Sequence, residues 1–81
     1  MKAFDLKYFK DSKSFSVSDF QRPSKTVKIN LDRIISITSL EMLHAPFSGT
    51  AHGYYSLVNL EGNNTYAINE ESYNKLNKAI S

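Results

Sequence analysis

The chain has 81 residues, of which 41% are hydrophobic and ten are aromatic, which is enough apolar material for one small core but not for two. It contains no cysteine, which excludes a disulfide framework and a thiolate metal site. The net charge is only +2, but eight basic and four acidic residues precede Ile34, whereas two basic and four acidic residues follow, so the two parts carry +4 and −2.

The first seven residues carry a charge at every second or third position, so no apolar run of the secretory type follows the start. No apolar run elsewhere approaches the length of a membrane span. We therefore expect a single small domain over residues 1–81, located in the cytoplasm, with no membrane partner.

Two strands are predicted at the beginning of the chain. Residues 4–8 alternate apolar and charged side chains, which is typical of a half-buried strand. In residues 14–18, Phe15 and Val17 alternate with three serines, and the turn-like residues 10–13 lie between the two segments. We expect these segments to pair as a hairpin that ends before Pro23, because proline supplies no ladder donor.

Further strands are predicted in the middle of the chain. Residues 27–31 alternate regularly, and the β-branched run 34–38 is the strongest strand pattern in the sequence, extending to about Leu43. Within that run we expect Ile35 and Ile37 to share one face. Residues 44–53 lack periodicity and contain one proline and two glycines, so they are interpreted as a loop.

The last third of the chain predicts a hairpin followed by a helix. Residues 54–60 are apolar on both faces, as in a central strand, and residues 61–64 have the composition of a tight turn leading to a strand at 65–68. Asn69 is a favourable N-cap, and Tyr73, Leu76 and Ile80 form one apolar stripe. The predicted fold is α+β and mostly β, with five or six antiparallel strands in a bent sheet or small open barrel and one C-terminal helix.

The sequence gives little support for a catalytic site or a metal-binding site. Ser48, His44 and His52 are the residue types of a hydrolase, with Asp32 or Glu41 to orient an imidazole, but they fall in a loop of a domain too small for a deep cleft. The same histidines with Glu41 lack the short ligand spacing of zinc sites. We expect no enzyme activity, no metal and no cofactor.

The leading hypothesis is a non-catalytic module that binds a protein partner, with self-association as a further option. Aromatic residues and methionine are enriched at interface centres, and a small core cannot absorb all of them. The candidates are His44, Phe47, Ser48, His52, Tyr54, Phe20 and Met42. The alternative is nucleic-acid binding through a basic face around the third predicted strand, formed by Arg22, Lys25, Lys28 and Arg33.

Residues 25–80 contain a series of motifs: the run of residues 27–34, a strand after it, the Leu-Val-Asn-Leu-Glu-Gly hairpin at 57–62, Tyr-Ala-Ile at 66–68 and Glu-Glu-Ser at the helix start. In this order the chain resembles small bacterial proteins of the flagellar FlbD-like type, and its pattern is also similar to the β portion of LytTR-type DNA-binding domains. The N-terminal segment and residues 44–53 depart from the flagellar pattern. The Lys-, Asn-, Ser- and Ile-rich composition is similar to that of small proteins of AT-rich bacteria and their phages, including inhibitors and regulators.

Overall fold

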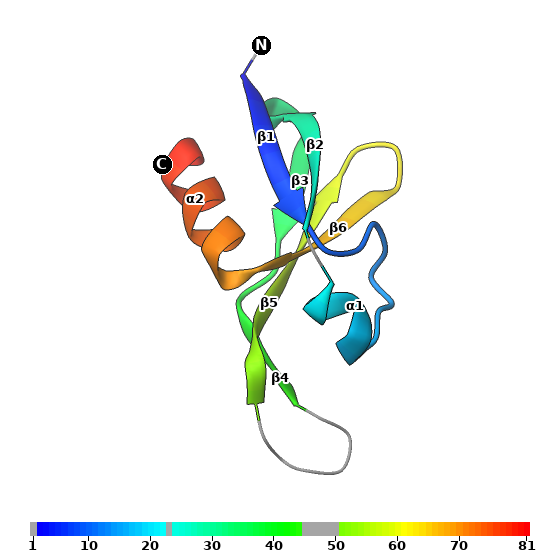
Figure 1. Cartoon of the computed structure of the whole chain (residues 1–81). Coiled ribbons are helices and arrows are strands. Elements are labelled where there is room, and N and C mark those ends of the chain that lie inside the picture. The colour runs from blue at the N-terminus through cyan, green and yellow to red at the C-terminus, as the bar shows by residue number, and fades with distance from the viewer. Residues whose placement is uncertain (1, 23, 45–50) are drawn as a thin grey trace.

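The structure, a computed structural model, describes residues 2–22, 24–44 and 51–81, without the side chains of residues 44, 51 and 52. This part of the chain contains six strands, two helices and one 3₁₀ turn (Figure 1). In chain order they are β1 (Ala3–Tyr8), α1 (Val17–Gln21), β2 (Lys25–Asn30), η1 (Leu31–Arg33), β3 (Ile34–Ile37), β4 (Glu41–His44), β5 (Ala51–Leu60), β6 (Asn64–Asn69) and α2 (Glu70–Ile80).

The strands form two open antiparallel sheets, one of β1 and β2 and one of β3 to β6. Strand β5 is the centre of the larger sheet. It pairs with β6 from Tyr55 to Leu60 on one edge, while β3 and β4 pair with successive lengths of the other edge. The fold is therefore α+β and mostly β, as the alternation pattern predicts.

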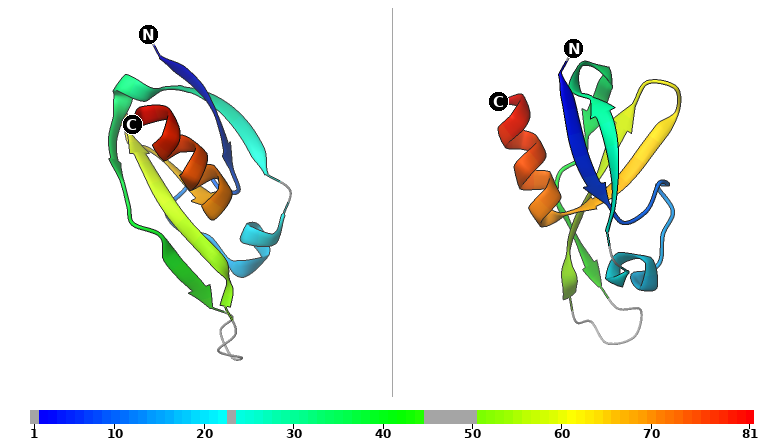
Figure 2. Two further views of the ribbon diagram at one scale, coloured as in Figure 1. Left: turned by 90° about the vertical axis from the view of Figure 1, so that its left-hand side faces the viewer. Right: turned by 45° about the horizontal axis from the view of Figure 1, so that its top comes forward.

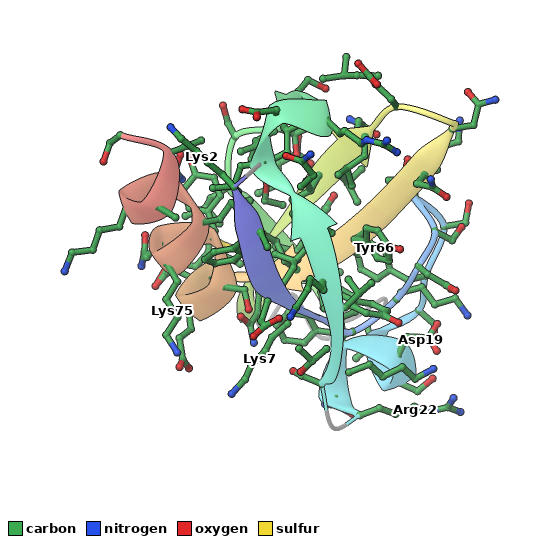
Figure 3. The ribbon with its side chains drawn as sticks, turned by 90° about the horizontal axis from the view of Figure 1, so that it is seen from above. Lys2, Lys7, Asp19, Arg22, Tyr66 and Lys75 are labelled. Carbon is green, nitrogen blue, oxygen red and sulfur yellow. The ribbon has the colours of Figure 1, made fainter. Side chains whose placement is uncertain are left out.

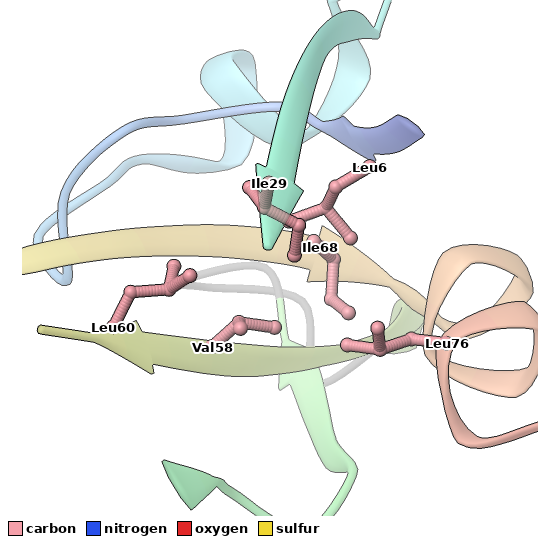
Figure 4. Close-up of a cluster of buried hydrophobic side chains, with 6 residues drawn as sticks. All are labelled: Leu6, Ile29, Val58, Leu60, Ile68 and Leu76. Atoms are coloured by element: carbon pink, nitrogen blue, oxygen red, sulfur yellow. The ribbon is translucent and has the colours of Figure 1, made fainter. Parts of the chain in front are cut away.

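A short backbone bridge joins the two sheets. The Phe9 N–H donates to the Ala67 carbonyl oxygen at 2.9 Å, and the Ala67 N–H donates to the Lys10 carbonyl oxygen at 2.7 Å. At this bridge the two-stranded sheet of β1 and β2 meets the larger sheet and lies over its face (Figure 2). The core fills the space between them and consists of Leu6, Ile29, Val58, Leu60, Ile68 and Leu76 (Figure 4).

Helix α2 begins where the sequence predicts. Asn69 caps it by accepting a hydrogen bond from the Ser72 N–H at 2.9 Å. Leu76 is fully buried and Tyr73 packs against the core, but Ile80 is 47% exposed, so the predicted stripe is wrong at its last position. The helix continues past the edge of the apolar surface, and Ser72 rather than Ile80 is buried beside Leu76.

The predicted first hairpin is wrong. Strand β1 pairs with β2, and residues 17–21, part of which the pattern assigns to a strand, form the short helix α1. Ser16 makes a capping box with Asp19: its Oγ atom accepts from the Asp19 N–H at 3.3 Å, and its N–H donates to the Asp19 carboxylate at 3.0 Å. Ser16 therefore acts through its hydroxyl group at a helix start, where serine is favoured, and not as an alternating strand residue.

The strand predicted over residues 34–43 is divided into β3 and β4, and its expected facing is wrong. The register shifts between Ile34 and Ser36, so Ile35 has no partner opposite it and is 67% exposed. Ile34 and Ile37 pack against the core instead. A bulge inserts one residue and resets the alternation, which a strict period of two cannot anticipate.

Candidate functional site

The hairpin of β4 and β5 projects beyond the body of the domain and carries two exposed apolar side chains (Figure 1). Met42 and Tyr54 are paired directly across the two strands, with exposed fractions of 44% and 40%. Both are residues that the sequence singles out as interface candidates. Their side chains share one face of the sheet because directly opposed residues of antiparallel strands point the same way.

The opposite face of this hairpin is held by the side chain of Tyr55. Its hydroxyl group donates to the Glu41 carboxylate at 2.9 Å, and its ring meets the Phe15 ring edge to face with centroids 5.0 Å apart. The hydrogen bond to Glu41 raises the pKa of the Tyr55 phenol, and burial and the negative charge of Glu41 act in the same direction. These contacts anchor the hairpin on the side away from Met42 and Tyr54.

Phe20, another interface candidate, belongs to an aromatic cluster and is half-buried. Its ring meets that of Phe9 edge to face with centroids 5.1 Å apart, and Phe9 contacts Phe15 in the same way at 4.8 Å. The cluster packs α1 and the segment before it onto the larger sheet. Phe20 therefore contributes first to packing, and only part of its surface is open to a partner.

The remaining candidates are His44, Phe47, Ser48 and His52. Phe47 and Ser48 lie outside the described residues. The loop predicted over residues 44–53 is wrong at both ends, since β4 includes His44 and β5 begins at Ala51. The backbones of His44 and His52 are thus in strands, while their side chains lie outside the described part of the structure. Among the described residues, no group of three or more potential ligands gathers into a metal site.

A cleft of about 390 Å³ lies at the other end of the domain, between β2 and the β5–β6 hairpin. Its apolar lining comes from Ala3, Val27, Ile29, Leu60 and Tyr66, and Tyr66 is seen beside β2 in Figure 3. Its polar lining comes from Lys28, Asn30, Arg33, Glu61 and Asn64. No sequence motif predicts this cleft, because it forms only where β2 packs beside residues 30 or more positions later in the chain.

The four basic residues of the nucleic-acid alternative do not gather at one place. Lys28 and Arg33 line the cleft. Arg22 follows α1 and forms an exposed ion pair with Asp19 at 3.8 Å (Figure 3). Lys25 is the first residue of β2, whereas the cleft is lined by the later residues of that strand. Hydrogen bonds from Ser16, above all from its backbone N–H, lower the pKa of Asp19, so this carboxylate is kept charged beside Arg22.

The helices of the described chain are too short and too polar to cross a membrane. No family model, no curated protein and no solved structure matches the chain. The resemblance to FlbD-like proteins stays a prediction from the sequence pattern. Functional inference therefore depends on the surfaces described above.

Proposed function

We propose that this chain is a non-catalytic module that binds a protein partner through the projecting β4–β5 hairpin. The observation that carries the proposal is the exposed pair of Met42 and Tyr54 on neighbouring strands. The methionine side chain is flexible and adapts its shape to a partner, whereas the tyrosine ring offers a rigid apolar surface. A few side chains of this kind supply most of the binding energy at many interfaces.

The geometry of the hairpin supports this proposal. Its other face is fixed by the hydrogen bond from Tyr55 to Glu41 and by the ring contact with Phe15. A preformed surface loses less conformational entropy on association than a flexible one. Phe47 and Ser48 are near this hairpin in the sequence, and we include them in the proposed contact region as candidates.

A protein partner is favoured over nucleic acid because the basic residues are divided between two ends of β2. A nucleic-acid surface requires cations that follow a phosphate backbone over several nucleotides. Arg22 has an acidic neighbour, and Lys28 shares its cleft with Glu61. The exposed apolar pair on the hairpin, by contrast, is uncharged.

The test is affinity capture from a bacterial lysate with the immobilised full chain, with and without nuclease. We expect a captured protein that is retained after nuclease treatment and lost with the double variant Met42→Ala/Tyr54→Ala. The matched control is Ile35→Ala, which removes an even more exposed apolar side chain from β3. Urea unfolding of all variants separates lost binding from lost folding.

Two results would contradict the proposal. If capture is unchanged in the double variant, the hairpin is not the contact surface. If the captured material disappears with nuclease, the partner is held through nucleic acid. Sedimentation of the purified chain across a range of concentrations tests the separate option of self-association.

A further inference from the structure

Strand β2 has a free edge, whose geometry follows from its pairing with β1. The N–H of Leu31, the residue that follows β2, donates to the Lys2 carbonyl oxygen at 2.9 Å, so the backbone polar groups of Leu31 point towards the β1 side. In an antiparallel pair the positions that bond to the neighbour recur at every second residue. Three residues of β2 fill the intervening positions, and their backbone N–H and C=O groups point away from β1: Thr26, Lys28 and Asn30.

No second strand covers that edge within the described residues, where β2 pairs only with β1. The cleft of about 390 Å³ opens beside it instead. Val27, Ile29 and Leu60 contribute apolar surface to this cleft, and the ring of Tyr66 forms part of its wall. An extended peptide that adds to a sheet edge uses two features. Free backbone N–H and C=O groups of the edge strand give it hydrogen bonds, and an adjacent apolar cleft accepts every second side chain.

The charge at the cleft selects for an acidic occupant. Lys28 and Arg33 are exposed, and among the described residues neither side chain has a carboxylate within 4.0 Å or any hydrogen-bond partner. Glu61 is the single acidic side chain in the described lining. Asp5 is paired opposite Lys28 on β1 but makes no ion pair with it. Lys28 and Arg33 therefore both keep charges that acidic side chains on an incoming strand would neutralise.

We propose that the free edge of β2 binds an extended acidic segment of another protein as an added strand, with its acidic side chains beside Lys28 and Arg33. This site is separate from the Met42–Tyr54 surface and does not depend on it. A second copy of the chain is a poorer occupant, because antiparallel pairing of two β2 edges centred on Lys28 would place like charges opposite each other. A single strand of nucleic acid would use the cations but leave the backbone groups of β2 unpaired.

The experiment measures fluorescence anisotropy of three labelled probes with the full chain. The first is a hexapeptide that alternates glutamate and valine, the second alternates lysine and valine, and the third is an oligothymidine of about ten nucleotides. We expect the acidic peptide to bind and the basic peptide to bind at least about tenfold more weakly. Amide hydrogen exchange should slow at Thr26, Lys28 and Asn30 when the acidic peptide is present.

Two sets of variants separate the charge from the strand edge. Lys28→Ala and Lys28→Pro both remove the cation, but only Lys28→Pro removes the outward N–H, and it leaves the bonds to β1 in place because that N–H points away from β1. We expect Lys28→Pro to bind the acidic peptide about tenfold more weakly than Lys28→Ala. The pair Lys28→Glu/Arg33→Glu should reverse the preference and select the basic peptide.

Each other outcome overturns the inference. If Lys28→Ala and Lys28→Pro bind the acidic peptide equally well, the peptide does not add as a strand. If Lys28→Glu/Arg33→Glu still prefers the acidic peptide, charge does not select the occupant. Binding of oligothymidine alone assigns the cleft to nucleic acid. If no probe binds at all, the edge is not a docking site. The variant Met42→Ala/Tyr54→Ala should bind the acidic peptide as the unchanged chain does. The β2-edge proposal and the hairpin proposal can therefore fail independently of each other.

Discussion

The ring of Phe20 lies so close to Gly53 that a Cβ atom added at the glycine would be 3.0 Å from the ring's Cζ atom. Gly53 also has a φ of +146°, a backbone conformation that residues other than glycine rarely adopt. We expect Gly53→Ala to lower the free energy of unfolding by roughly 1–3 kcal/mol, because it adds both backbone strain and a ring contact. Urea denaturation measures the change.

The two causes can be separated in the background of Phe20→Ala. Removing the ring should reduce the cost of Gly53→Ala, while the backbone part of the cost remains, so the two substitutions should not be additive. Strict additivity would show that the ring does not restrict this position.

Leu76 and Ile80 lie on the same helix but should differ sharply in their contribution to stability. Leu76 is fully buried in the core, and Leu76→Ala should lower the free energy of unfolding by about 2–5 kcal/mol through lost burial and the resulting cavity. Ile80→Ala should cost less than about 1 kcal/mol because its side chain is already 47% exposed. Thermal or urea unfolding of both variants provides the measurement, and similar losses would contradict the observed packing of α2.

The capping box of α1 gives a third prediction. Ser16→Ala removes the hydroxyl group that accepts from the Asp19 N–H, and it should cost about 1 kcal/mol of stability. Ser14→Ala serves as the control, since Ser14 is exposed and its hydroxyl group makes no hydrogen bond in the described structure. Equal stabilities of the two variants would mean that the cap does not hold α1.

The contact between Tyr55 and Glu41 predicts a response to high pH. The pKa of Tyr55 is raised above its ordinary value of 10.0, mainly by the hydrogen bond to Glu41, so the folded chain retains the phenol proton more strongly than the unfolded chain. The resulting stability is present below pH 10.0 and is lost as the pH rises through the pKa of the folded state.

Titration of the Tyr55 ring by NMR measures this shift directly. In Glu41→Gln the amide can still hydrogen-bond the phenol but carries no charge, so the pKa of Tyr55 should move part of the way towards 10.0. In Glu41→Ala it should move further. A Tyr55 pKa that is the same in all three proteins would assign the shift to burial alone.

The elements that the sequence predicts well are those where one local pattern decides the structure. The turn after β5 requires positive φ at Gly62 and Asn63, and these residue types tolerate it. Helix α2 begins at the predicted N-cap because the side chain of Asn69 satisfies a free N–H of the first turn. The ion pair between Glu71 and Lys75, 3.2 Å apart, follows from their spacing of four residues.

The errors arise where two patterns compete or where distant residues meet. Ser16 fits an alternating strand as well as a helix cap, and packing of Phe15 and Phe20 on the distant strand β5 favours the helix. The bulge at Ile35 has no sequence marker. For the candidate sites, residue type alone singles out Met42 and Tyr54 as candidates, but their pairing and the cleft beside β2 depend on tertiary contacts that no local window contains.

The bridge between Phe9, Lys10 and Ala67 links the early and late parts of the chain through main-chain atoms alone. Among substitutions at these positions, only proline at Phe9 or Ala67 removes a donor N–H, so the coupling tolerates most other changes of residue type. Leu6 and Ile68 are buried on either side of this link, and neither can reach water while it is closed. The sheet of β1 and β2 and the larger sheet should consequently open as one cooperative unit, and the Ala67 amide should exchange with solvent only when they open.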